Sequence, residues 1–424
     1  MRFDGLWRHP DFVRLWAGQT VSIFGSYIGN TALRFGAILV LDARAYEMAL
    51  LVAAGIVPEL ITGPLIGVWV DRLRRRPIMI AADLGRAALL ASIPAAYALD
   101  ALTIGQMYVV AFLTGVLSMS FNVAYRSYLP SLVRRDELLE GNSKLSASES
   151  VAEVGAFGIA GWLVQALTAP FAILIDAVSF IGSALFVGMI RKDETPPARD
   201  QRTGMLREAA EGIRTIANNS ILRATTIAES IAHFAFGMFG AGYALYGIRV
   251  LDLQPGVVSM VAAVGGVSSF VGALVAGRAA RRLGTGPAMV TGAAFMGASM
   301  LLVPLAHGPA LVAAAFLMAQ QLGDGGYVVY DINQVSTRQA ITADRLLGRV
   351  NSGVDICAHG AMLVGVLTFG LLGETVGLRT SLAVAAAVML FAAVWLAVSP
   401  VARLREVPGR EAPLDPARRA SEAS

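Results

Sequence analysis

The sequence predicts an all-α membrane protein with twelve transmembrane helices, arranged as two six-helix halves of the same orientation. Three observations support this fold class. Of the 424 residues, 56% are hydrophobic and only 15% are charged, whereas a soluble domain carries about 25% charged residues. The chain also divides into apolar runs of bilayer length, and its basic residues are concentrated in alternate loops.

Apolar runs set the number and position of the helices. A hydrocarbon core of roughly 30 Å requires about 20 helical residues, and twelve runs of about this size occur in the sequence. They cover residues 13–40, 46–70, 77–98, 102–127, 143–168, 170–190, 221–249, 255–279, 286–306, 309–335, 348–373 and 377–400. Each run is expected to form one membrane-crossing helix.

The distribution of basic residues orients these helices. With the N-terminus in the cytoplasm, 29 of the 34 Lys and Arg residues lie in or beside cytoplasmic segments, and 3 lie in the opposite loops. The other two, Arg34 and Arg86, lie within predicted helices. Because basic loops stay on the cytoplasmic side, we expect both termini to be cytoplasmic. The excess of Arg over Lys, with abundant Ala, indicates a GC-rich bacterial source, so the expected location is the bacterial cytoplasmic (inner) membrane.

A weak internal repeat divides the chain. Arg72, Arg75 and Arg76 align with Arg278, Arg281 and Arg282, and segment 136–142 aligns with segment 344–350. Parallel repeats of this kind are typical of transporters whose solute site lies between the halves, near the middle of the bilayer. The predicted regions are an N-terminal six-helix bundle (residues 1–190), a cytoplasmic linker (191–220), a C-terminal six-helix bundle (221–400) and a cytoplasmic tail (401–424).

The linker contains one predicted helix. Its apolar residues Leu206, Ala210, Ile213 and Ile216 follow helical spacing, which favours an amphipathic helix on the cytoplasmic face. A soluble linker helix is the alternative.

Several functional classes are disfavoured. The basic residues lie between apolar runs and not on a solvated domain, so nucleic acid is not an expected partner. No Gly-x-x-x-x-Gly-Lys-Ser/Thr loop occurs, so ATP is not the immediate driver. No convergent nucleophile or metal set indicates an enzyme, and no cofactor or metal site is predicted. The chain is expected to be monomeric, with the lipid bilayer, a small-molecule substrate and protons as its partners.

The loop after the second predicted helix carries the clearest motif. The stretch GVWVDRLRRRP, residues 67–77, resembles the Gly-x-x-x-Asp-Arg-x-x-Arg-Arg loop motif of the major facilitator superfamily. Its positions are filled by Gly67, Asp71, Arg72, Arg75 and Arg76. The resemblance implies that Asp71 pairs with helices of the facing half and latches the outward-facing state. Arg74 departs from the pattern, because the family often has glycine there.

Other stretches resemble one branch of this superfamily, that of the enterobactin exporter and the macrolide efflux proteins. They are HPDFVRLWAGQTVS, ADLGRA, LPSLVRRDELLEGNS, LIDAVSFIGSALF and EGIRTIANNSILR, and together they span both halves. The resemblance implies a major facilitator fold and proton-coupled export of a small amphipathic molecule, such as a drug or a siderophore-like metabolite. Ala156 departs from the branch, which often has a Gly-Pro pair there in a motif associated with antiporters.

The alternatives are a proton-symport importer and a membrane sensor that no longer transports. Within the branch motifs, Asp83 and Arg86 are assigned with Arg126 to the same latch as Asp71. Asp176 is assigned a structural role.

Polar residues within the helices mark the predicted solute site. An ionisable group in the hydrocarbon region costs about 2.5 to 3.5 kcal/mol, so each needs a function or a partner. The resemblance implies that helices one, four, seven and ten line the cavity. The predicted substrate-binding residues on these helices are Tyr27, Asn30, Arg34, Asn122, Tyr125, Phe236, Gln320 and Tyr327. Arg34 would attract an anionic group or hold an acid ionised, and a fixed pair with Glu59 is the alternative.

Asp324 is the first candidate for the carboxylate that binds the coupled proton. It lies near the middle of the tenth predicted helix, flanked by Gly323, Gly325 and Gly326, which allow another helix or a solute to approach the backbone. A contact between Asp324 and Arg34 that forms and breaks during transport would bind and release a proton.

Further candidates for proton coupling are two acid–histidine pairs. Glu229 precedes His233, and Asp355 precedes His359, by four residues. An acid and a histidine one helical turn apart can share a proton, because histidine titrates near neutral pH. Each pair could also neutralise itself within the core. A same-face pair in the fifth helix, Glu149 and Glu153, is assigned to the basic loops in preference to proton binding.

Overall fold

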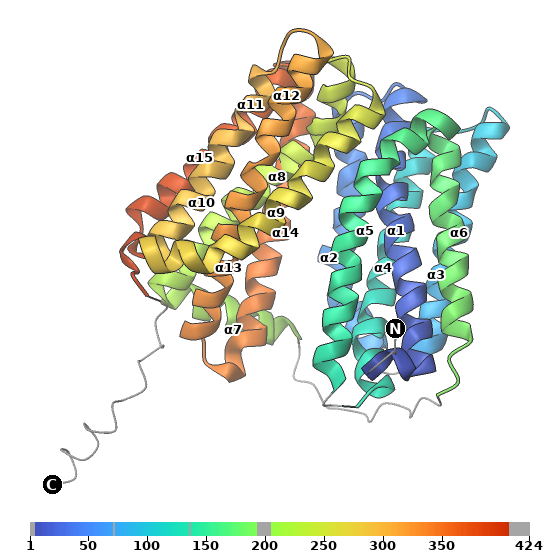
Figure 1. The fold of residues 1–424 in the computed structure, drawn as a ribbon, viewed down its shortest axis with the longest axis horizontal. Coiled ribbons are helices and arrows are strands. Elements are labelled where there is room, and N and C mark those ends of the chain that lie inside the picture. The colour runs from blue at the N-terminus through green and yellow to red at the C-terminus, as the bar shows by residue number, and fades with distance from the viewer. Residues whose placement is uncertain (1–4, 71–72, 135–136, 193–204, 407–424) are drawn as a thin grey trace.

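The computed structural model describes residues 5–70, 73–134, 137–192 and 205–406. Fifteen α-helices and two short 3-10 helices, η1 (Gly5–Arg8) and η3 (Pro400–Arg403), occur in these ranges, and no strand does. The helices form two elongated bundles (Figure 1). The predicted all-α fold class is confirmed.

Six helices build the first half. They are α1 (Pro10–Leu39), α2 (Ala45–Val70), α3 (Arg75–Ala98), α4 (Ile104–Leu132), α5 (Leu138–Leu167) and α6 (Ala169–Gly188). Polar residues begin two of them: the His9 and Thr103 side chains accept hydrogen bonds from backbone N–H groups of the first turn. A single residue, Thr168, joins α5 to α6 with a left-handed φ of 68°, and Pro170 in the first turn of α6 favours the new helix.

Eight helices build the second half. They are α8 (Ser220–Arg249), α9 (Pro255–Leu283), α10 (Thr285–Met300), α11 (Leu302–Leu305), α12 (Ala310–Gln321), α13 (Gly323–Ile341), α14 (Asp344–Thr375) and α15 (Leu378–Val398). The ninth and tenth predicted spans are each interrupted, at Leu301 and at Leu322. Pro304 explains the first interruption, because it has no N–H group to bond to the preceding turn.

Nine helical segments of the described chain are long and apolar enough to cross a membrane. They lie on α3, α4, α5, α6, α8, α9, α10 with α11, α14 and α15. The three other predicted spans fall on α1, on α2 and on α12 with α13. Whether these three also cross the membrane stays a prediction, and so does the total of twelve spans.

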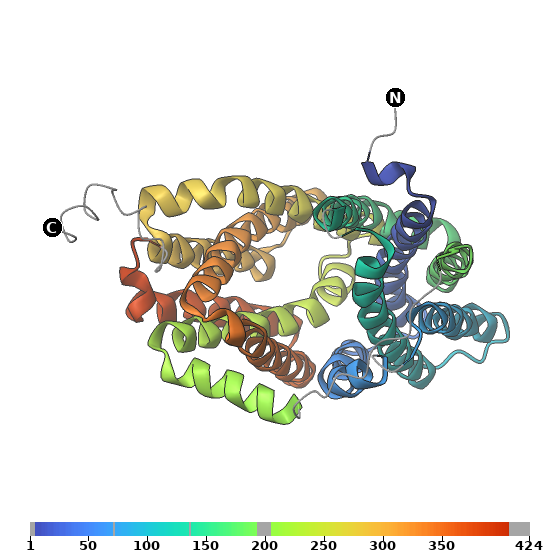
Figure 2. The same ribbon diagram turned by 90° about the horizontal axis from the view of Figure 1, so that it is seen from below.

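The two halves pack against each other through α5 with α9 and through α2 with α14. Seen from below, they form two bundles side by side (Figure 2). In Figure 1 their ribbons approach each other at the top and diverge toward the bottom. The molecule is therefore joined at one end only.

We call the joined end the closed end. There Arg249 pairs with Asp42 at 2.5 Å, and Gln165 donates a hydrogen bond to Gln254 at 2.9 Å. Gly161 packs directly against the carbonyl of Pro255. We call the opposite end, which carries η1, η3 and the linker helix, the open end.

The predicted linker helix is α7 (Met205–Asn218), which packs on α14 and α8. Its residue Gly212 contacts the backbone of Arg349, and Glu211 forms an ion pair with the Arg349 side chain. Ile216 is buried in an apolar cluster with Val350 and Val354. The linker helix thus belongs structurally to the second half.

Only part of the predicted latch lies within the described residues. Gly67 is in α2, while Asp71 and Arg72 lie outside the described residues. Arg76 donates to the carbonyls of Val187 and Gly188, the last residues of α6, where a cation is favourable. A latch between the halves stays a prediction, because this structure holds the halves apart at that end.

Candidate functional site

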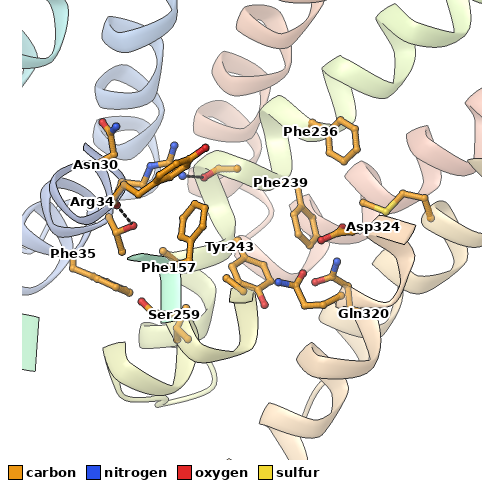
Figure 3. Close-up of a pocket in the computed structure, with 18 residues that line it drawn as sticks. Asn30, Arg34, Phe35, Phe157, Phe236, Phe239, Tyr243, Ser259, Gln320 and Asp324 are labelled. Atoms are coloured by element: carbon orange, nitrogen blue, oxygen red, sulfur yellow. Dashed lines mark hydrogen bonds between the residues drawn. The ribbon is translucent and has the colours of Figure 1, made fainter. Parts of the chain in front are cut away.

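A cavity of about 300 Å³ lies between the two halves, and we call it the central cavity. Helices α1, α5, α8, α9, α10, α12 and α13 contribute its walls. Six of the eighteen residues that line it are aromatic: Tyr27, Phe35, Phe157, Phe236, Phe239 and Tyr243. The polar exceptions include Asn30, Arg34, Gln320 and Asp324 (Figure 3). Such a mostly apolar cavity with a few converging polar groups is typical of a small-molecule site.

Arg34 reaches across the cavity from α1. Its side chain is exposed to the cavity, and it donates a hydrogen bond to the carbonyl of Gly240 in α8 at 3.4 Å. Figure 3 shows Arg34 and Asp324 on opposite sides of the cavity, and no ion pair joins these two described residues. The predicted contact between them is thus not formed in this state. The side chain of Glu59, the alternative partner, lies outside the described residues.

Asp324 lies directly after the interruption between α12 and α13. Ser268 of α9 bridges this interruption: its hydroxyl donates to the carbonyl of Leu322 at 2.8 Å and accepts from the N–H of Gly325 at 3.0 Å. The serine satisfies backbone groups that the broken helix leaves free, as buried polar groups require. Leu322 itself keeps helical angles, with φ of −63° and ψ of −23°, so the interruption is a local change of hydrogen bonding beside the half-buried Asp324.

The glycines around Asp324 allow close helix packing. Gly325 contacts Gly272 of α9, and Gly326 contacts Gly292 of α10 through its carbonyl. A Cβ at either partner would overlap the backbone of α13. Of the two roles that the sequence left open, these glycines therefore serve the approach of other helices.

Glu229 lies behind the cavity wall, not on it. It is buried and accepts hydrogen bonds from the hydroxyls of Tyr330 at 2.8 Å and Tyr327 at 3.4 Å. The Tyr327 ring packs edge-on against Phe236 at 4.7 Å. Tyr327, predicted to bind substrate, is not among the residues that line the cavity. It connects Glu229 to the wall residue Phe236.

The two acid–histidine pairs are neighbours in space. His233 lies 3.4 Å from a carboxylate oxygen of Glu229, and its ring centroid is 6.0 Å from that of His359 on α14. The Nδ1 of His359 lies 2.9 Å from the backbone carbonyl of Asp355, whose side chain is exposed. The sequence suggested two separate pairs, whereas packing of α8 on α14 brings both histidines together. No group of three or more metal-ligating side chains occurs within the described part of the chain.

A second cavity of about 450 Å³ lies within the first half, and we call it the polar pocket. It is lined by Asn122, Tyr125 and Arg126 of α4 and by Arg86 of α3. Tyr27 and Asn30 line both the polar pocket and the central cavity. The structure therefore places the predicted substrate residues Asn122 and Tyr125 beside the central cavity, together with two arginines assigned to the latch.

Two acids of α5 lie near the cavities. Glu149 lines the polar pocket, as Arg126 does. Glu153 lies one turn before Phe157 of the cavity wall and within electrostatic range of Asp324 in the other half. The assignment of this pair to the basic loops stays a prediction. Glu149, Glu153 and Phe157 follow one another at intervals of four residues, which is the spacing of one helix face.

The chain has recognisable relatives. Residues 15–337 match the Major Facilitator Superfamily. The multidrug efflux pump Tap of Mycolicibacterium fortuitum is 24% identical, over 94% of this chain and 97% of that protein. Macrolide efflux protein A of Streptococcus pyogenes is 25% identical, over 58% of this chain and 60% of that protein. The uncharacterized transporter YfiS of Bacillus subtilis is 23% identical, over 89% and 90%.

Solved structures share the fold at low identity. The nucleoside transporter NupG superposes with a TM-score of 0.75 at 11% identity, covering 91% of this chain and 98% of that one. A bacterial homologue of ferroportin in its inward-facing state gives 0.76 at 17% identity, covering 93% and 98%. The family match over most of the length and these neighbours lead to one conclusion: the chain belongs to the Major Facilitator Superfamily and is a multi-pass membrane transporter, not an enzyme.

Proposed function

We propose that this transporter exports a small amphipathic molecule, such as a drug or a siderophore-like metabolite, in exchange for protons by alternating access. The observation that carries the proposal is the central cavity, which lies between two halves joined only at the closed end. Its aromatic walls suit an apolar solute body, while Arg34, Gln320 and Asp324 offer polar contacts. Tap and macrolide efflux protein A, both named as efflux proteins, support the direction.

The state described here is then inward-facing. The positive-inside distribution of Lys and Arg assigns the open end, with both termini and α7, to the cytoplasm of a bacterium. A solute would enter the central cavity from that side, by way of the polar pocket that shares Tyr27 and Asn30 with it. Release would require the contacts of the closed end to break and the open end to close.

Asp324 is the proposed proton-coupling acid. It lies next to the helix interruption at Leu322, where a change in its charge can alter the packing of α12, α13 and α9. The linked histidines, with Glu229 and Asp355, form the proposed route for protons on the second half. A membrane potential adds about 2.3 kcal/mol per charge per 100 mV, which makes proton exchange an effective driving force.

Transport by the full-length protein in proteoliposomes tests the proposal. Drugs and siderophores that stabilise the purified protein against heat would first identify candidate solutes. An imposed proton gradient should then drive the selected solute into inverted vesicles, with protons moving in the opposite direction. Solute and protons that move together would instead establish the symport importer, which the same cavity permits. A bound solute that never crosses the membrane would indicate a sensor.

A further inference from the structure

A buried charge network lies inside the first half, behind the polar pocket. Asp83 and Arg86 of α3 and Asp176 of α6 are 0%, 5% and 4% exposed. Arg86 pairs with the Oδ1 of Asp83. The guanidinium also lies between two aromatic rings, 4.7 Å from the centroid of Phe121 and 4.0 Å from that of Phe180. It stays charged under all physiological conditions.

Asp176 has no such partner. Its Oδ1 accepts hydrogen bonds from the hydroxyls of Ser179 at 3.2 Å and Ser26 at 3.3 Å. Its carboxyl group fills the space next to Gly29 of α1, where a Cβ would overlap it. No ion pair to Asp176 occurs among the described residues, so the nearby guanidinium of Arg86 acts on it only through space.

The network contains two acids and one cation. An unbalanced negative charge buried at this depth is costly, and the other packed helices do not balance it. Helix α1 contributes Ser26, and α4 contributes the neutral Ser118, which accepts a hydrogen bond from Arg86. The charged groups across the polar pocket, Arg126 and Glu149, are exposed and opposite in sign.

We propose that Asp176 is a proton-binding site, so that Asp83, Arg86 and a protonated Asp176 together carry no net charge. Asp83 stays ionised because it directly holds the guanidinium, whereas the hydrogen bonds described for the Asp176 carboxyl group come from hydroxyls. Ser26 lines the polar pocket and touches Asp176, which gives the proton a path to the open end. The proposal rests on the charges of the first half alone, and it holds whether or not Asp324 carries a proton or the solute is a drug.

Infrared spectroscopy of the full-length protein in lipid vesicles tests this site without any transport assay. At neutral pH the wild type should show the C=O stretch of a protonated carboxyl group, which shifts in D₂O. Asp176→Asn should remove the component of this band that belongs to Asp176, and Asp42→Asn, which changes an exposed acid of the closed end, should retain that component. Ser26→Ala keeps the acid but removes one hydrogen bond, so it should move the band to higher frequency.

Each outcome of the infrared experiment either supports or overturns the assignment of a proton to Asp176. A band that is unchanged in both Asp176→Asn and Ser26→Ala would overturn the assignment, even if Asp176→Asn were poorly folded, because Ser26→Ala tests the same carboxyl group. A band that does not shift in D₂O would overturn the path to the polar pocket. A band lost on Asp176→Asn that shifts on Ser26→Ala would establish a proton site in the first half.

Discussion

The two halves have the same orientation but hold their buried charges in different ways. In the first half, Arg86 is held by Asp83 and two aromatic rings within continuous helices. In the second half, Glu229 is held by tyrosine hydroxyls and His233, and the helix that carries Asp324 is interrupted at Leu322.

This difference indicates which half responds to a change of charge. A buried guanidinium–carboxylate pair is broken only at a large cost in free energy. Hydroxyls, in contrast, can either donate or accept a hydrogen bond, and a histidine can gain or lose a proton, without losing their positions. We therefore infer that the Arg86–Asp83 pair makes the first half the more rigid body, in which a proton on Asp176 balances the buried charge, and that changes of packing on proton binding occur mainly in the second half.

The largest expected effect comes from joining the halves covalently. In a Cys357→Ser background, Gly158→Cys and Ala263→Cys place thiols on α5 and α9. A Cβ at residue 158 would lie 3.7 Å from that of Ala263, close to the disulfide mean of about 3.8 Å. Oxidation should form the bridge and abolish transport, and reduction should restore it, because the halves must separate here. Mass spectrometry detects the bridge, and each single cysteine variant is the control. Normal transport by the bridged protein would show that both halves need not move apart.

The second test addresses the interrupted helix. Asp324→Asn should lower solute-linked proton flux by about 100-fold, the lower range for removal of a proton-transfer group. The fluorescence of a pH-sensitive dye inside proteoliposomes measures this flux. Asp344→Asn, which changes an exposed acid at the open end of the same half, is the matched control. Unchanged flux in Asp324→Asn would remove this residue from the mechanism.

The third test concerns the rigid half. Arg86→Ala leaves Asp83 buried without its cation, so it should destabilise the protein by about 3 to 5 kcal/mol. Arg126→Ala, on the same polar pocket but exposed, should change stability by no more than about 0.5 kcal/mol. Unfolding of the purified protein in micelles compares the two variants. Equal losses of stability in the two variants would contradict the contrast between the buried Arg86 and the exposed Arg126.

The smallest effect is expected at the edge of the first half. Asp11 precedes the first predicted span. Burial alone would raise the pKa of its carboxyl group. Hydrogen bonds from the backbone N–H groups of Arg191 and Lys192 and from the Arg14 side chain outweigh this effect and hold the pKa below 3.8. The ionised form therefore stabilises the fold above pH 3.8, and this contribution is lost as the pH falls through the lower folded pKa.

Asp11→Asn should accordingly cost about 1 kcal/mol at neutral pH. The difference from the wild type should shrink in acid. Thermal unfolding of both proteins, measured at neutral pH and in acid, checks this. Asp100→Asn, which changes an exposed acid, is the control. A cost that is independent of pH would mean that the carboxylate charge contributes nothing.

Much of this protein follows from local sequence alone. Run length and the position of arginines predict a helical membrane protein, because bilayer thickness and loop charge act on each segment separately. Helical spacing likewise grouped Tyr27, Asn30 and Arg34 on one face, and all three line the central cavity. A period of 3.6 residues is a property of one helix and needs no knowledge of its neighbours.

Only the tertiary structure decided what each face meets. It set Arg34 against the carbonyl of Gly240 and not against Asp324, and it placed Ser268 at the interruption beside Asp324. It also brought Asp176 of α6 next to Arg86 of α3. These contacts join helices that are distant in the chain, and they depend on which end of the two halves is closed. No periodicity within one segment contains that information.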